Sequence, residues 1–217
     1  MKLLDDLLEL LYPTRCVFCH KLTPHREKVC ANCLRTLPRV PSAAQKQSFP
    51  HISACVSPLY YEGDVRRSLL RYKFGGLSFY AEEYAVFVVK CIDENDIICD
   101  SITWVPLSRR RLRKRGYDQA RLLAEAIAAR TGLPCVRTLV KIRDNPPQSR
   151  TEKASERRAN AAGAYSAASD TEYTGKRFLL VDDIVTTGAT LSECASVLRR
   201  AGAASVSAAT LARAKLG

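Results

Sequence analysis

The sequence predicts an α/β fold with a doubly wound parallel sheet, preceded by a small cysteine-rich unit. Apolar runs alternate with helical segments over residues 51–217, which is the pattern of parallel α/β sheets. The clearest run, residues 178–181, has the length and composition of a buried strand, and a helix is predicted at 191–200. Two C-x-x-C pairs mark the first 40 residues as a separate unit.

The remaining elements follow from the same patterns. Strands are expected at 52–61, 101–106, 134–141, 176–181 and 205–211, and further helices at 64–73, 81–92, 119–130 and 151–160. The segment 38–50, with Pro, Ser, Ala and Gln, is interpreted as a linker. Two domains are therefore expected: residues 1–40, with an N-terminal helix and the cysteine unit, and residues 51–217, with the sheet.

The strongest functional signal lies between the strand at 178–181 and the helix at 191–200. Two carboxylates, Asp182 and Asp183, precede a loop made of Thr186, Thr187, Gly188, Ala189 and Thr190. Backbone N–H groups at a helix N-terminus attract phosphate, and a glycine lets the backbone approach it. Carboxylates only accept hydrogen bonds, so they suit sugar hydroxyls, directly or through Mg²⁺. The pattern predicts a ribose 5-phosphate site; the alternative is an ordinary turn with N-capping threonines.

This stretch resembles the signature with which type I phosphoribosyltransferases bind phosphoribosyl pyrophosphate (PRPP). The resemblance implies that the threonine loop wraps the 5-phosphate and that Asp182 and Asp183 take the ribose 2- and 3-hydroxyls. It implies Mg²⁺ bound together with the pyrophosphate. It also implies a loop after the first core strand that meets the pyrophosphate, and a mobile loop near residues 145–165 that covers the site.

A basic segment follows the strand predicted at 101–106. It comprises Ser108, Arg109, Arg110, Arg111, Arg113, Lys114 and Arg115. We expect a loop here that meets the pyrophosphate or binds single-stranded DNA, with a solvated charged loop as the alternative. For DNA, Lys153, Arg157 and Arg158 are further candidates, and Tyr72, Phe74 and Tyr117 are candidates for base stacking, with core packing as the alternative for each.

The composition limits the possible partners and the compartment. The net charge of +12 favours a polyanionic partner: nucleic acid, a phosphorylated substrate or an anionic lipid surface. No apolar run approaches the length of a membrane span. Acidic residues interrupt the leucine-rich residues 1–11, which is not typical of a signal peptide, and a short docking helix is expected there, with a membrane anchor as the alternative. Nine cysteines without an export signal predict a reducing, cytoplasmic environment, in which clustered cysteines bind metal.

The cysteine cluster predicts one structural zinc ion. Its ligands would be Cys16, Cys19, Cys30 and Cys33. Four thiolates leave no open position for a substrate, so the site is not expected to be catalytic. A redox dithiol is one alternative, and a c-type haem at Cys16-x-x-Cys19-His20 is another, which lacks an axial methionine because Met1 is the only one. The isolated cysteines, Cys55, Cys91, Cys99, Cys135 and Cys194, are expected to be buried.

Several stretches, in order along nearly the whole chain, resemble the ComF family, the ComFC proteins of bacterial natural transformation. They are Leu-Tyr-Pro-Thr-Arg-Cys at 11–16, Leu-Arg-Tyr-Lys at 70–73, Arg-Gly-Tyr-Asp-Gln at 115–119, Gln-Ser-Arg-Thr at 148–151, Arg-Arg-Ala-Asn at 157–160 and the Asp-Asp loop. At Asp118 the sequence departs from the family, where Asn is commoner. The resemblance implies a zinc ribbon, a phosphoribosyltransferase-like domain and a cytoplasmic role in handling single-stranded DNA during uptake, with a helicase as a possible partner.

Three functions agree with these observations. The first is a DNA-uptake protein that binds single-stranded DNA or a helicase and keeps a ribose 5-phosphate pocket. The second is an active phosphoribosyltransferase that uses PRPP and an unidentified acceptor. The third is a sensor in which PRPP or a nucleotide controls partner binding. The sequence contains no evident base-recognition motif or general base, since His20, His25 and His51 all lie in the N-terminal third, so catalysis stays open.

Overall fold

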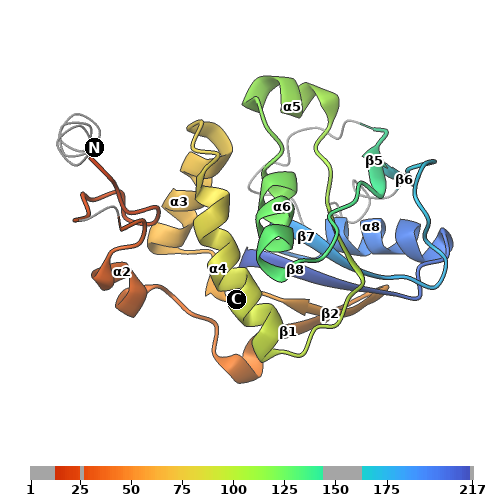
Figure 1. Cartoon of the computed structure of the whole chain (residues 1–217), viewed down its shortest axis with the longest axis horizontal. Helices are drawn as coiled ribbons and strands as arrows, with labels where there is room; N and C mark the ends of the chain where they lie inside the picture. Colours follow the sequence, from red (N-terminus) through yellow and green to blue (C-terminus); the bar gives the residue numbers. More distant parts are fainter. Residues whose placement is uncertain (1–12, 25–26, 144–162, 216–217) are drawn as a thin grey trace.

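The computed structural model describes residues 13–24, 27–143 and 163–215. Its centre is a six-stranded sheet in the order β1-β2-β8-β7-β4, with β3 also paired to β8 (Figure 1). The strands are β1 (Lys46–Phe49), β2 (Ile52–Val56), β3 (Leu59–Tyr60), β4 (Ser101–Trp104), β7 (Arg177–Val185) and β8 (Ser205–Arg213). All of these pairs are parallel except β1 with β2. The predicted α/β sheet is confirmed, with one antiparallel strand added at its edge.

The two faces of the sheet carry different layers. The helices α3 (Gly63–Phe74), α4 (Tyr80–Glu94) and α6 (Gln119–Thr131) pack against one face, and α8 (Ala189–Arg200) packs against the other. Successive side chains of β7 alternate between the two cores: Leu179 lies in the core of α3, α4 and α6, whereas Leu180 lies in that of α8. The strand is buried on both sides, which explains its continuous apolar run.

Two segments differ from the sequence-based expectation. The supposed linker at 38–50 contains the short 3-10 helix η1 (Ser42–Ala44) and strand β1, which extends the sheet through its pairing with β2. The strand expected at 134–141 is reduced to β5 (Leu139–Lys141), which pairs with β6 (Tyr165–Ala167) in a separate two-stranded antiparallel sheet. The β1–β2 pairing joins neighbouring segments, Lys46 with Val56 and Phe49 with Ile52, whereas the β5–β6 pairing joins residues more than twenty positions apart, which a local pattern does not reveal.

The basic segment is a helix and not a loop. Helix α5 (Arg109–Arg115) buries no side chain, so packing does not explain it. The residues at its two ends explain the helix. The Ser108 side chain accepts a hydrogen bond from the backbone N–H of Arg111, and Gly116 ends the helix in the left-handed conformation. Three basic residues in the last turn also favour a helix C-terminus.

The N-terminal unit packs directly on the sheet domain. Val17 and Phe18 are fully buried and belong to the same core as α3, α4 and α6. The Phe18 ring meets the rings of Tyr84 and Phe87 at centroid distances of 5.8 and 5.3 Å. The cysteine unit and α4 therefore share one hydrophobic core.

Some predicted features lie outside the described residues. They are the leucine-rich helix at 1–11, the mobile loop and basic helix before residue 163, and Lys153, Arg157 and Arg158. Within the described ranges, no helix has the length and apolar character needed to cross a membrane.

Candidate functional site

The acidic pair and the threonine loop lie at the carboxyl edge of the parallel sheet. Strand β7 continues to Val185, so Asp182 and Asp183 lie within its last residues. The sequence analysis expected them to follow the strand. The pairing of β4 with β7 ends at Trp104 and Val181, and the chain beyond β4 leads directly into α5. Ligands of open α/β sheets bind at this edge, and here it brings the basic helix beside the acidic pair.

The loop meets the N-terminus of α8, and the helix has no side-chain cap. Gly188 is the N-cap residue, with a φ of 72°, and no side chain caps the helix N-terminus. The nearest contact, between the Ala189 backbone N and the Thr187 Oγ1, is long at 3.5 Å. The N-capping threonines of the alternative interpretation are therefore not seen. The loop encloses a hollow of 40 Å³ at the positive end of the helix, the arrangement that suits a phosphate.

Phe49 supports the loop from behind. A Cβ added to Gly188 would lie 2.2 Å from the Phe49 ring, so no other residue fits without displacing that ring. Phe49 comes from β1, in the segment interpreted as a linker, and the sequence-based reasoning missed it. Phe49 and Gly188 are 139 positions apart in the chain, so their contact leaves no local signal in the sequence.

The two carboxylates are in different environments. Asp182 Oδ1 accepts the backbone N–H of Asp183 at 2.8 Å. Burial, and then the charge of Asp183, raise the pKa of Asp182 well above its usual range. A carboxyl group with a raised pKa in the folded state contributes stability that is lost as the pH rises above the unfolded-state pKa toward the folded one. Loss of the proton from Asp182 is therefore less favourable than from a free carboxyl group.

Lys73 is the cation that the pair contacts. Its Nζ lies 2.6 Å from Asp183 Oδ2, in a direct ion pair. Lys73 is the last but one residue of α3 and comes from the Leu-Arg-Tyr-Lys stretch, to which the sequence analysis assigned no role. Lys73 of α3 therefore balances part of the negative charge of the acidic pair.

A cavity of 470 Å³ brings six of the predicted ligand-binding residues together. It is lined by Asp182, Asp183, Thr186 and Thr190 on one side and by Arg111 and Arg115 of α5 on another. Lys73, Asp118, Gln119, Lys141 and Tyr165 also line it, and none of them was a predicted site residue. Lys141 and Tyr165 face each other across the small β5–β6 sheet, where the lysine Nζ donates to the tyrosine hydroxyl at 3.2 Å.

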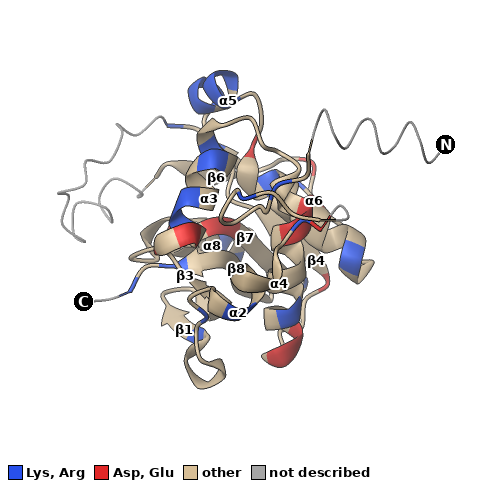
Figure 2. Ribbon diagram, turned by 90° about the vertical axis from the view of Figure 1, so that its left-hand side faces the viewer, with Lys and Arg blue, Asp and Glu red and all other residues tan. Residues whose placement is uncertain are grey.

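Helix α5 divides its basic residues between two surfaces. Arg111 and Arg115, four positions apart, are half-buried and line the cavity. Arg109, Arg110, Arg113 and Lys114 are exposed, and Figure 2 shows α5 as a nearly continuous blue band projecting from the molecule. One run of sequence thus supplies charge both to the cavity and to the outer surface.

The aromatic candidates for base stacking have different positions. Tyr72 is fully buried, so its role is core packing, and Tyr117 is half-buried. Phe74 is 64% exposed, and the Arg115 guanidinium lies 4.9 Å from its ring centroid. Among the three, only Phe74 presents its ring to solvent.

Asp118 has a structural role beside the cavity. Its carboxylate accepts the backbone N–H groups of Leu107 at 2.9 Å and Arg121 at 3.3 Å, and it forms the N-cap of α6. Burial raises the pKa of this carboxyl group. An Asn at this position, as is commoner in the resembling family, offers one oxygen in place of two.

The four predicted zinc ligands converge. The sulfur atoms of Cys16, Cys19, Cys30 and Cys33 lie within 4.8 Å of one another, and they are the one such cluster among the described residues. Backbone N–H groups of Cys30 and Cys33 point at the Cys16 and Cys30 sulfurs, each at 3.4 Å, which stabilises thiolates. Burial raises the pKa of the Cys16 thiol, but hydrogen bonds from the backbone N–H groups of Cys30, Cys19 and Phe18 outweigh burial and lower that pKa to about 7. The donor set fits a structural zinc ion.

Two family models match the chain. The model described as Phosphoribosyl transferase domain matches residues 118–216, and the model described as Double zinc ribbon domain matches residues 7–50. The first contains the acidic pair and the threonine loop, and the second contains the four clustered cysteines. The fold is therefore type I phosphoribosyltransferase-like, with an N-terminal zinc ribbon, as the sequence predicts.

Three curated relatives are named as competence or DNA utilization proteins. Competence protein F of Haemophilus influenzae is 27% identical over 92% of this chain and 97% of that protein. Competence protein ComFC of Bacillus subtilis is 31% identical over 70% of this chain and 61% of that protein. DNA utilization protein YhgH of Salmonella typhi is 35% identical over 52% of this chain, which spans about half the length of that relative.

Proposed function

Because the chain belongs to the ComF/ComFC family, we propose that it acts in DNA uptake and binds a ribose 5-phosphate ligand at the carboxyl edge of its sheet. The observation that carries the proposal is the cavity in which an uncapped helix N-terminus, an acidic pair and basic side chains meet. These three parts are complementary to a phosphate, a sugar and a second anionic group respectively.

PRPP has the chemical groups that the cavity would recognise. Thr186, Thr187, Gly188, Ala189 and Thr190 would hold the 5-phosphate, mainly through backbone N–H groups. Asp182 and Asp183 would accept the ribose hydroxyls. Arg111 and Arg115 would balance the pyrophosphate, with Mg²⁺ entering together with that group.

An active phosphoribosyltransferase is the second candidate. The acidic pair and phosphate loop favour it, since both would be needed to hold PRPP during transfer. Among the residues that the structure describes, no histidine, the commonest general base, lines the cavity. Release of pyrophosphate from PRPP in the presence of candidate acceptors would identify the enzyme; binding without release would identify a sensor.

Ligand binding is expected to raise the melting temperature of the wild-type chain. A ligand at a hundred times its Kd adds about 2.7 kcal/mol to the free energy of unfolding. Asp182→Asn/Asp183→Asn should remove this ligand-dependent shift. The amides lack the negative charge that pairs with Lys73, and they lack the carboxylate oxygens proposed to accept the ribose hydroxyls. The measurement is thermal unfolding with PRPP and Mg²⁺, ribose 5-phosphate or nucleoside monophosphates. A wild-type chain that responds to none of them would contradict the ribose 5-phosphate proposal.

Single-stranded DNA is the proposed second partner, and the outer face of α5 would bind it. Arg109, Arg110, Arg113 and Lys114 are exposed there. Beside them lies a groove of 710 Å³ lined by Trp104, Arg109, Leu112, Arg121 and Arg137, among other residues. A basic surface with an aromatic ring suits the backbone and bases of a single strand. A helicase partner and a cytoplasmic location are part of the same proposal and come from the family relationship.

DNA binding is expected to weaken with salt and with the loss of the α5 charges. The logarithm of the affinity should fall with a slope of about −0.7 per phosphate contacted. Arg109→Ala/Arg113→Ala/Lys114→Ala should lower both the affinity and the slope. The matched control Arg66→Ala/Lys90→Ala/Lys176→Ala removes the same charge elsewhere and should change both less. Equal effects of the two triple variants in a fluorescence-anisotropy titration would argue against α5 as the DNA-binding surface.

A further inference from the structure

One charged side chain of the cavity is already engaged. The Lys73 Nζ and the Asp183 Oδ2 are 2.6 Å apart, and the two side chains are only 20% and 9% exposed. Water and salt screen such a sheltered pair much less than a surface pair. Breaking it without a replacement would leave a buried charge without a partner.

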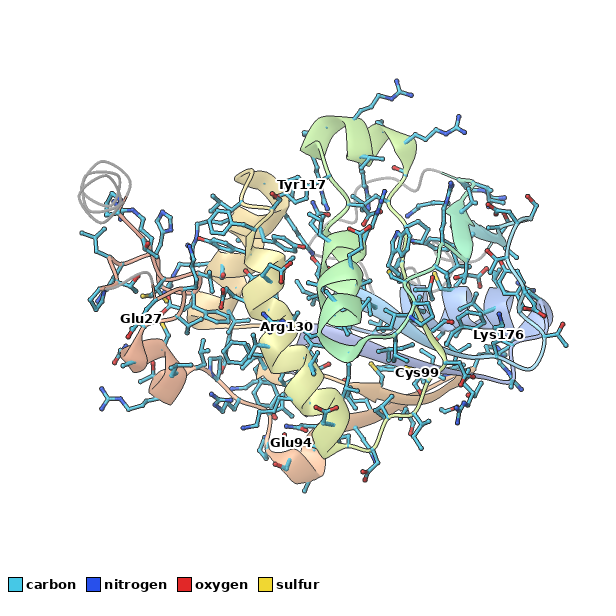
Figure 3. All side chains as sticks on the ribbon, viewed as in Figure 1. Glu27, Glu94, Cys99, Tyr117, Arg130 and Lys176 are labelled. Carbon is cyan, nitrogen blue, oxygen red and sulfur yellow. The ribbon has the colours of Figure 1, made fainter. Side chains whose placement is uncertain are left out.

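The helix that carries Lys73 is fixed immediately before it. The Tyr72 hydroxyl donates to the backbone carbonyl of Gln119 at 2.8 Å. The hydroxyl of Tyr117, a residue labelled in Figure 3, donates to the carbonyl of Tyr72. Arg71 donates to the carbonyl of Phe18 in the cysteine unit at 2.5 Å. These contacts hold the last turn of α3 in position, so the lysine is pre-organised toward Asp183.

The same contacts leave little place for a resident divalent cation. Mg²⁺ keeps most of its waters and needs oxygen ligands in near-octahedral geometry. Asp183 already faces an ammonium group, and Asp182 Oδ1 accepts a backbone N–H. The acidic pair by itself therefore does not fit a Mg²⁺ site.

We propose that Lys73 is the resident cation of the acidic pair, so that the cavity binds sugar 5-phosphate monoesters without a divalent metal. This inference rests on the proposed ribose 5-phosphate function and names its ligand class: ribose 5-phosphate and nucleoside monophosphates. Lys73 offsets the charge of Asp183, which would otherwise repel an incoming phosphate. Mg²⁺ then accompanies only ligands that bring a pyrophosphate of their own.

Calorimetric titration of the zinc-loaded chain with ribose 5-phosphate tests this inference. Two buffers are compared, one with Mg²⁺ and one without added Mg²⁺. Neither buffer contains a chelator, because a chelator would remove zinc. We expect wild-type Kd values that agree within about threefold, a difference below 0.7 kcal/mol. Lys73→Met should raise the Kd by about tenfold or more in the metal-free buffer, and Mg²⁺ should recover part of that loss.

Two further variants serve as controls. Lys90→Met removes an equal charge from the exposed side of α4, where Lys90 pairs loosely with Glu94 at 3.7 Å, and should leave the Kd unchanged. Lys73→Arg keeps the charge and should retain metal-free binding. Wild-type binding that requires Mg²⁺, or Lys73→Met binding equal to wild type without metal, overturns the inference alone. No wild-type binding of ribose 5-phosphate in either buffer overturns the proposed function as well.

Discussion

Cys30→Ser is expected to remove the zinc and to unfold the N-terminal unit. Structural zinc contributes of order 10–16 kcal/mol to small domains that have too little core of their own. The shared core extends the effect: Val17 and Phe18 are fully buried against the sheet domain, and Phe18 contacts Tyr84. We therefore expect the side of α4 facing the unit to loosen while the sheet stays folded. Metal analysis and near-ultraviolet circular dichroism measure the two parts of this result.

A cysteine outside the cluster provides the control. Cys99, labelled in Figure 3, is half-buried, and Cys99→Ser should retain one zinc per chain and a nearly unchanged melting temperature. Zinc retained in a Cys16→Ser/Cys30→Ser variant would contradict the assignment of the metal site. An unchanged aromatic spectrum in a zinc-free variant would contradict the coupling between the unit and α4.

Gly188→Ala is expected to destabilise the chain by about 2–4 kcal/mol and to abolish binding of a 5-phosphate. The φ of 72° is unfavourable for a residue with a Cβ, which costs roughly 1–2 kcal/mol. The added methyl group would also lie 2.2 Å from the Phe49 ring, an overlap that typically costs about 1–3 kcal/mol. Either the ring or the loop must move, and the loop is the proposed phosphate site. Urea unfolding and ligand titration measure the two effects.

The chain offers a matched glycine for comparison. Gly132 also has a φ of 72°, but a Cβ there would meet no atom within 4 Å, so Gly132→Ala measures the backbone strain alone. Gly188→Ala/Phe49→Ala should recover the part of the loss that comes from the ring. If Gly188→Ala and Gly132→Ala lose the same stability, the Phe49 contact has no energetic weight.

The position of residues 182–190 between β7 and α8 was predictable because its signal is local. Asp182, Asp183 and Gly188 lie within a few positions of the buried strand. Their place at the end of the sheet therefore does not depend on contacts with distant segments. The cysteine cluster was predictable for the same reason, since each C-x-x-C pair places two thiols close together. Their convergence within 4.8 Å agrees with that prediction.

Other parts of the site depend on contacts between distant segments. Lys73 reaches Asp183 because α3 packs beside β7, and Phe49 reaches Gly188 because β1 pairs with β2. Local patterns contain no information about either contact. The basic helix α5 is a different case: its capping residues Ser108 and Gly116 were visible in the sequence, but six basic residues in a short run outweighed them in the interpretation as a loop.

The central claim is that residues 186–190 hold the 5-phosphate of a sugar, and amide chemical shifts measured by heteronuclear NMR test it most directly. Ribose 5-phosphate should shift the backbone amides of Thr187, Gly188, Ala189 and Thr190, because these N–H groups lie at the uncapped start of α8. Ribose without phosphate, at the same concentration, should leave them in place. Loop amides that do not respond to ribose 5-phosphate, while amides near Trp104 and Arg137 in the neighbouring groove do, would contradict the account.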